Sequence, residues 1–186
     1  MRVLKSTIIK KAVRSVKRIT RSTALVMYRK QLSRFHKTKA GNNIIITQRN
    51  VVIGTDDTWF NAVQIDRNPS WVVVPDARYV WSSRDQGAEV AVISKQFSLS
   101  SRRRVRNASL LLSVDNYAIV LINGQFVVYD TPQATPSFFN PGRTFDVRRL
   151  LRRGENDIVI IAFNFGGRRT ADNPAGVSAR LSIRQS

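Results

Sequence analysis

Two apolar runs meet at a single Asn123-Gly124 pair, and this junction constrains the fold more than any other feature of the sequence. The runs are YAIVLI, residues 117–122, and QFVVY, residues 125–129. A two-residue turn of type I′ needs positive φ at both central positions, which Asn and Gly tolerate and β-branched residues do not. The sequence therefore predicts an antiparallel hairpin over residues 117–129.

Both faces of this hairpin are apolar. Because side chains alternate along a strand, Ile119 and Leu121 fall on one face, and Val120 and Ile122 fall on the other. One face fills a core, so something else has to cover the second. Three covers stay open from the sequence: a long loop of the same domain, the N-terminal segment, or another subunit.

Other short apolar runs recur along the chain with turn signals between them. Asn68-Pro69, Asn140-Pro141-Gly142 and Asn173-Pro174 are such signals. The further predicted strands are 44–53, 59–65, 71–74, 89–99, 108–114, 156–165 and 176–184. This many short strands without helical periodicity between them favour an all-β fold, an antiparallel jelly-roll β-sandwich over residues 44–186.

Charge is distributed unevenly. The chain of 186 residues has a net charge of +19, and residues 1–55 contain 14 Lys or Arg and no acidic residue. Residues 56–186 hold 17 basic and 12 acidic residues. A segment of one sign repels itself and favours phosphates, anionic lipid or an acidic protein surface. We therefore predict that residues 1–43 form a separate basic arm.

The arm has helical periodicity. Apolar residues fall at helical spacing over 8–19, and a second stripe follows at Leu25, Tyr28, Leu32 and Phe35. Such a basic amphipathic helix can lie on a membrane, bind a partner's groove, contact nucleic acid, or pack on its own domain. The residues predicted to contact an anion, nucleic acid or a partner are Lys10, Lys11, Arg14, Lys17, Arg18 and Arg21.

Composition excludes several kinds of chemistry. The chain has no cysteine, which rules out disulfides, thiolate chemistry and cysteine-based zinc sites and is typical of a reducing compartment. His36 is the single histidine, so we expect no catalytic triad and no zinc-hydrolase cluster. We also expect no cofactor, no metal, no transmembrane segment and no secretory signal.

Two further groups of arginines stand out. Arg102, Arg103, Arg104 and Arg106 lie between two predicted strands, where they either grip phosphate or an acidic partner or form a solvated loop. The segment DVRRLLRRGEN, residues 146–156, carries four more. Its apolar residues indicate one helical turn, capped by Asp146 and ended by Gly154. Its arginines extend the same positive surface if the two segments meet.

The order of these features resembles a known family. Trp81, Tyr117, Asn123-Gly124, the segment 146–156 and Gly176 follow one another as in the galactose-binding-like jelly-roll domains of bacterial glycosidases, over about residues 71–184. The resemblance implies a non-catalytic β-sandwich. Residues proposed for sugar or partner contact are Trp81, Tyr117, Phe138, Phe139 and Asn164.

We expect no enzymatic activity, because no cleft-forming element accompanies the carboxylates of Asp115, Asp146 and Glu155. The first functional hypothesis is a structural assembly protein, such as a capsid or minor capsid component of a virion, whose arm binds neighbouring subunits or nucleic acid. This hypothesis rests on architecture alone, a β-sandwich with a basic arm. The alternative is a carbohydrate-binding module, and the second alternative is a general nucleic-acid-binding protein.

Overall fold

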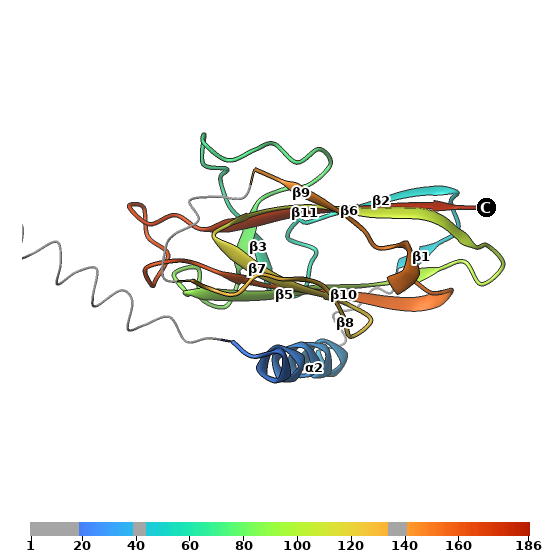
Figure 1. Cartoon of the computed structure of the whole chain (residues 1–186), viewed down its shortest axis with the longest axis horizontal. Coiled ribbons are helices and arrows are strands. Elements are labelled where there is room, and N and C mark those ends of the chain that lie inside the picture. The colour runs from blue at the N-terminus through green and yellow to red at the C-terminus, as the bar shows by residue number, and fades with distance from the viewer. Residues whose placement is uncertain (1–18, 39–43, 134–140) are drawn as a thin grey trace, which may run out of the picture.

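The computed structural model describes residues 19–38, 44–133 and 141–186. They form a β-sandwich of two sheets with one helix against the outer face of one sheet (Figure 1). The predicted all-β sandwich with a partly helical N-terminal segment is confirmed. In chain order the elements are α2 (Arg21–Lys37), β1 (Ile44–Ile46), β2 (Asn50–Gly54), β3 (Ala62–Gln64), β4 (Val80–Ser82), β5 (Val90–Leu99), β6 (Val105–Asp115), β7 (Tyr117–Ile122), β8 (Gln125–Tyr129), β9 (Arg143–Asp146), the 3-10 turn η1 (Arg148–Leu150), β10 (Gly154–Phe163) and β11 (Gly176–Gln185).

The first sheet has the strand order β1-β5-β10-β7-β8, and the second has the order β3-β4-β11-β6-β9. Strand β2 pairs with β11 as well, next to the end of β11 that β4 does not reach. The pairing of β1 with β5 is parallel, whereas the other pairings between described strands are antiparallel. Two long central strands, β10 and β11, therefore organise the two layers.

The main core lies between the sheets. On β7, Val120 and Ile122 face this core, while Ile119 and Leu121 belong to a second apolar cluster on the outer side. Strand β10 divides in the same way, with Ile158 and Ile160 inside and Val159 and Ile161 outside. The two apolar faces that we expected for the hairpin are therefore both buried.

Helix α2 covers the outer face of the first sheet. Its buried side chains are Ala24, Tyr28, Gln31 and Phe35, and Thr20 caps its first turn by accepting a hydrogen bond from the amide of Thr23. Tyr28 and Phe35 confirm the second apolar stripe. Of the three covers that the sequence left open, the structure shows the N-terminal segment.

The hairpin turn is as predicted. Asn123 and Gly124 have φ values of 50° and 78°. The Asn123 side chain also fastens the turn to its neighbours, because its Nδ2 donates to the Leu150 carbonyl at 2.8 Å and its Oδ1 accepts from the Asp157 amide at 3.1 Å. The turn thereby holds the start of β10 and the segment before it.

The turn predicted in residues 146–156 is present as the 3-10 turn η1, but it ends at Leu151, and Gly154 begins β10. The amide of Arg148 donates to Asp146 Oδ1 at 2.9 Å, Val147 is fully buried, and Gly154 has a φ of 75°. Asn156 Oδ1 accepts from the Arg152 amide at 2.9 Å, which closes the segment onto the next strand.

Several strand predictions were wrong. The run 44–53 divides into β1 and β2, which belong to different sheets. Residues 71–74 form a loop between Pro69 and Pro75, with Trp71 and Val74 buried and Val73 68% exposed. Strands β4 and β9 were missed, because they are only 3 and 4 residues long.

Candidate anion-binding site

Seven arginines line two neighbouring hollows at one end of the sandwich. They come from the residue before β2, the loop before β6 and the first residues of β6, the end of β11 and the segment around η1. This is the end at which β10 begins and the chain reaches its C-terminal residue (Figure 1). Arginine stays protonated throughout the physiological pH range, so the positive charge of this end is permanent.

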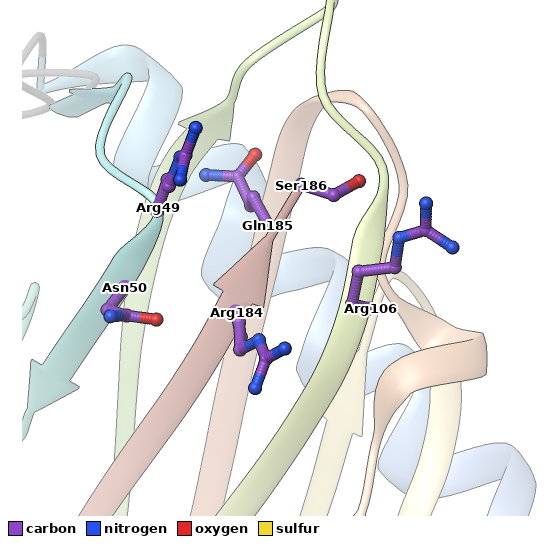
Figure 2. A pocket seen from close by; sticks show the side chains of 6 residues that line it. All are labelled: Arg49, Asn50, Arg106, Arg184, Gln185 and Ser186. Atoms are coloured by element: carbon purple, nitrogen blue, oxygen red, sulfur yellow. The ribbon is translucent and has the colours of Figure 1, made fainter.

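The first hollow, called here the strand hollow, has a volume of about 720 Å³. Figure 2 shows its six lining residues, which project from three adjacent strands and their ends. They are Arg49, Asn50, Arg106, Arg184, Gln185 and Ser186. All except Gln185 are exposed, so the hollow opens to solvent. Its volume lies within the range of small-ligand sites.

A β-bulge places Arg106 in the strand hollow. Arg184 lies opposite Asn107, but Gln185 lies opposite Val105, so Arg106 has no partner across the ladder. Such an extra residue changes the direction of the side chains around it. Val105 consequently packs against the core while Arg106 and Asn107 are both exposed.

Gln185 supplies a polar group at the base of the strand hollow. The residue is 2% exposed, and its Nε2 donates to the Gln48 carbonyl at 3.0 Å. Its Oε1 is buried and has no hydrogen-bond partner among the described residues. A buried acceptor without a donor is unfavourable, so this oxygen lowers the stability of the β11 end locally.

The second hollow, called here the turn hollow, has a volume of about 600 Å³. It is lined by Arg104, Val105, Arg148, Arg149, Leu151 and Arg153. The Nε of Arg153 donates to the Arg103 carbonyl at 3.1 Å, so the two arginine-rich segments meet in space. Segments 50 positions apart in the sequence thereby form one positive surface, as we expected if the two segments meet.

The ion pairs seen in the described residues involve other arginines. Those pairs join Arg143 to Asp130, Arg168 to Asp85 and Arg180 to Asp76. None uses an arginine of the two hollows. Asp146 lies beside η1, where it accepts the hydrogen bond from the Arg148 backbone. Charges of one sign gathered at one end of the molecule repel one another, which favours a bound anion there.

A third hollow, of about 370 Å³, lies within the loop between β3 and β4. Asp66, Arg67 and Arg78 line it with Ile65 and Val73. Its charges have both signs and it is smaller than the other two. The arginine-rich end is therefore the stronger candidate for a functional site.

The residues predicted to contact sugar lie inside the molecule where the structure describes them. Trp81 is fully buried and its indole nitrogen donates to the Ala88 carbonyl at 2.9 Å. Tyr117 lies under helix α2 and Asn164 is 3% exposed. The assignment of these three to a sugar is corrected, because a buried ring or amide presents no surface to a ligand. Phe138 and Phe139 lie outside the described residues.

The predicted arm contacts are only partly described. Lys10, Lys11, Arg14, Lys17 and Arg18 lie outside the described residues. Arg21 is the first residue of α2, and its guanidinium carbon lies 4.8 Å from the ring centres of both Phe126 and Tyr129 on β8. This cation–π contact gives Arg21 a role in holding the helix to the sheet.

Sequence analysis predicted only Arg106 of the strand hollow, and the five residues that it missed are Arg49, Asn50, Arg184, Gln185 and Ser186. Arg49, Arg184 and Gln185 are isolated in the sequence and belong to no basic run. Only the pairing of β11 with both β2 and β6 brings them together. In contrast, Arg104 was predicted from its run of arginines, and what this run binds stays a prediction.

The described residues show neither a membrane-spanning helix nor a cluster of metal ligands. In the described part of the chain, no helix is long and apolar enough to cross a membrane. The same residues contain no group of three or more His, Cys, Asp or Glu side chains placed to hold one metal ion.

No protein-family model matches this sequence, and no curated protein matches it either. Solved structures with a similar chain path include an α-L-rhamnosidase from Streptomyces avermitilis, with a TM-score of 0.46, 19% identity and coverage of 58% of this chain and 11% of that one. A family 35 carbohydrate-binding module from Clostridium thermocellum has a TM-score of 0.36, 12% identity and coverage of 71% and 97%. A β-glucuronidase from Ruminococcus gnavus has a TM-score of 0.43, 13% identity and coverage of 76% and 30%.

A similarity to viral capsid proteins is not shown. This chain corresponds to about a tenth of the rhamnosidase and to less than a third of the glucuronidase. Their TM-scores are too low to transfer a ligand from those proteins to this chain.

Proposed function

We propose that this protein is a non-catalytic module that binds an acidic polysaccharide through its arginine-rich end. The observation that carries the proposal is the strand hollow, which is lined by three arginines together with amide and hydroxyl side chains. A guanidinium group binds a carboxylate through two parallel hydrogen bonds. The exposed amide of Asn50 and the exposed hydroxyl of Ser186 suit the hydroxyl groups of a sugar ring.

The exposed polar side chains of the strand hollow, Asn50 and Ser186, support a ligand with hydroxyl groups. Phosphodiester and carboxylate groups offer only acceptors at neutral pH, so they pair with the arginines but not with the amide oxygen of Asn50. A sugar acid offers both kinds of group within one ring. The composition of the hollow therefore favours an acidic sugar over a simple anion.

The same surface is a poor match for nucleic acid. Proteins that bind single strands stack bases on exposed aromatic rings, and the large hydrophobic residues exposed in the described chain are Val26, Val52 and Val73. A duplex is bound through an element that enters a groove, whereas the strand hollow lies across a sheet. Nucleic acid therefore serves as the competing ligand in the experiment described next.

The assembly role expected from the basic arm stays a prediction. We had expected the helical segment to reach a neighbouring subunit or nucleic acid, but residues 21–37 pack on the sandwich of their own chain. We therefore place polysaccharide binding first.

Calorimetric titration with polygalacturonate tests the proposal, with its fully methyl-esterified form as the neutral counterpart. We expect binding of the acid form that weakens as salt rises, and no binding of the ester. The variant Arg106→Ala/Arg184→Ala should bind about tenfold more weakly, since each arginine contributes a charged hydrogen bond. The matched control is Arg29→Ala/Lys30→Ala, which removes two exposed charges from α2 and should bind like the wild type.

Three results would contradict the proposal. Equal binding of the acid and the ester would exclude recognition of the carboxylates. Preference for polyuridylate over polygalacturonate would indicate a nucleic-acid-binding protein. Equal losses in the hollow variant and the α2 control would indicate non-specific attraction to net charge.

A further inference from the structure

The arginines of the two hollows form a row that crosses the second sheet at its end. Asn50 on β2 pairs with Arg184 on β11, and Arg184 pairs in turn with Asn107 on β6. The amide of Val147 donates to the Ala108 carbonyl at 3.0 Å, so η1 continues the sheet on the far side of β6. Arginines therefore follow one another from β2 to β11, to β6 and to η1.

The two hollows adjoin each other along β6. Arg104 and Val105 line the turn hollow, and Arg106 lines the strand hollow. The amide of Ser186 donates to the Arg104 carbonyl at 3.0 Å, which brings the edges of both hollows together. Residues two positions apart in a strand are separated by roughly 7 Å. One ligand can thus pass from one hollow to the other over the bulge at Arg106.

The row is longer than a single sugar ring. Three spacings between neighbouring strands separate β2 from η1, which corresponds to roughly 14 Å. A monosaccharide or a free inorganic anion occupies one hollow and leaves the arginines of the other without a counter-charge. A linear polymer that carries a charge on successive units supplies both.

We propose that the strand hollow and the turn hollow are two subsites for one chain of acidic polysaccharide, which runs across the end of the second sheet. This inference rests on the proposed function and adds that the ligand is an extended polymer bound along its length. Binding to the second hollow becomes intramolecular once the first is filled, so affinity rises steeply with ligand length. Beyond the length that fills both hollows, affinity rises no further.

Titration with galacturonate oligomers of one, two, four and eight units tests the inference. We expect affinity to rise by at least about tenfold between the shortest oligomers and those that reach both hollows, and then to level off. Arg149→Ala in the turn hollow should weaken the long oligomers and leave the monomer and dimer unaffected if these prefer the strand hollow. Arg184→Ala should weaken every length, and a thermal melt verifies that each variant is folded.

A monomer or dimer that binds as tightly as the octamer would overturn the inference and leave the proposed function standing. So would an octamer that loses no affinity in Arg149→Ala. Two octamers bound per protein, one in each hollow, would likewise overturn it. Failure of every length and of the polymer to bind would remove the proposed function itself, and the inference with it.

Discussion

The Tyr28 hydroxyl donates a hydrogen bond of 2.8 Å to the Asp157 carboxylate, which joins helix α2 to the central strand β10 across 129 residues of sequence. Burial raises the pKa of the Asp157 carboxyl above its ordinary value, and the hydrogen bond from Tyr28 opposes this rise. Burial also raises the pKa of Tyr28 well above its usual range, so the phenol remains a donor. The contact thus helps to fix the helix on the sheet.

The variant Tyr28→Phe should lower the free energy of unfolding by about 1–3 kcal/mol. The ring still fills its place, but a buried acceptor on Asp157 loses its donor. Urea denaturation followed by circular dichroism measures the change. Combination with Asp157→Asn in a double-mutant cycle isolates the contact, and additive losses would show that the two groups are not coupled.

Removal of residues 1–43 should make the sandwich aggregate, because it uncovers the outer face of the first sheet. That face carries Ile119, Leu121, Val159 and Ile161, all fully buried in the intact chain. Binding of a hydrophobic dye and light scattering detect the exposed surface. Removal of residues 1–18 is the matched control, since it keeps α2. A monomeric, dye-negative protein after the longer truncation would show that the helix is dispensable.

The stability of the fold should depend on pH through Asp115. Burial raises the pKa of this carboxyl to about 6, although Trp71 donates a hydrogen bond to it at 3.0 Å. The folded state therefore binds the proton more tightly than the unfolded state. The stabilising effect of this group is complete below about pH 4 and is lost as the pH rises through 6.

The comparison of wild type with Asp115→Asn measures this effect. Between pH 4 and pH 7 the stability of the wild type should fall relative to the variant, by up to about 3 kcal/mol. Asn keeps an oxygen that can accept from Trp71. Parallel stability profiles for the two proteins would exclude a raised pKa at this position.

The hydrogen bonds of the Asn123 side chain should contribute more to the stability of the fold than the backbone conformation at Gly124. Asn123→Ala removes the hydrogen bonds to Leu150, Asn156 and Asp157, for an expected loss of about 2–4 kcal/mol. Gly124→Ala keeps these bonds and strains a residue with a φ of 78°, for an expected loss of about 1–2 kcal/mol. Thermal melts of both variants test this order, and a larger loss in Gly124→Ala would reverse it.

Local sequence signals predicted the parts of the fold that depend on neighbouring residues. The hairpin at Asn123-Gly124 and the capped turn after Asp146 required only a few adjacent positions. The break between β1 and β2 has no proline or glycine to mark it, since the chain passes through Thr47, Gln48 and Arg49. There the choice of sheet is made by distant strands, which a local pattern does not reveal.

The candidate site was predictable only where its residues cluster in the sequence. The run at Arg102–Arg104 was evident, whereas Arg49 and Arg184 reach the same surface through the pairing of β2, β11 and β6. The exposed fraction of each side chain was the other quantity that the sequence did not reveal. A tryptophan such as Trp81 suits a sugar site and a core equally well in sequence, and the fold buries it completely.

An amide map by two-dimensional NMR tests the central claim most directly. On titration of the labelled protein with galacturonate octamer, we predict shifts concentrated at residues 49–50, 104–107, 148–153 and 184–186. These residues come from four separate parts of the sequence and meet at one end of the sandwich. Shifts concentrated on helix α2, or in the loop 165–175 at the opposite end, would contradict the claim that the arginine-rich end is the binding site.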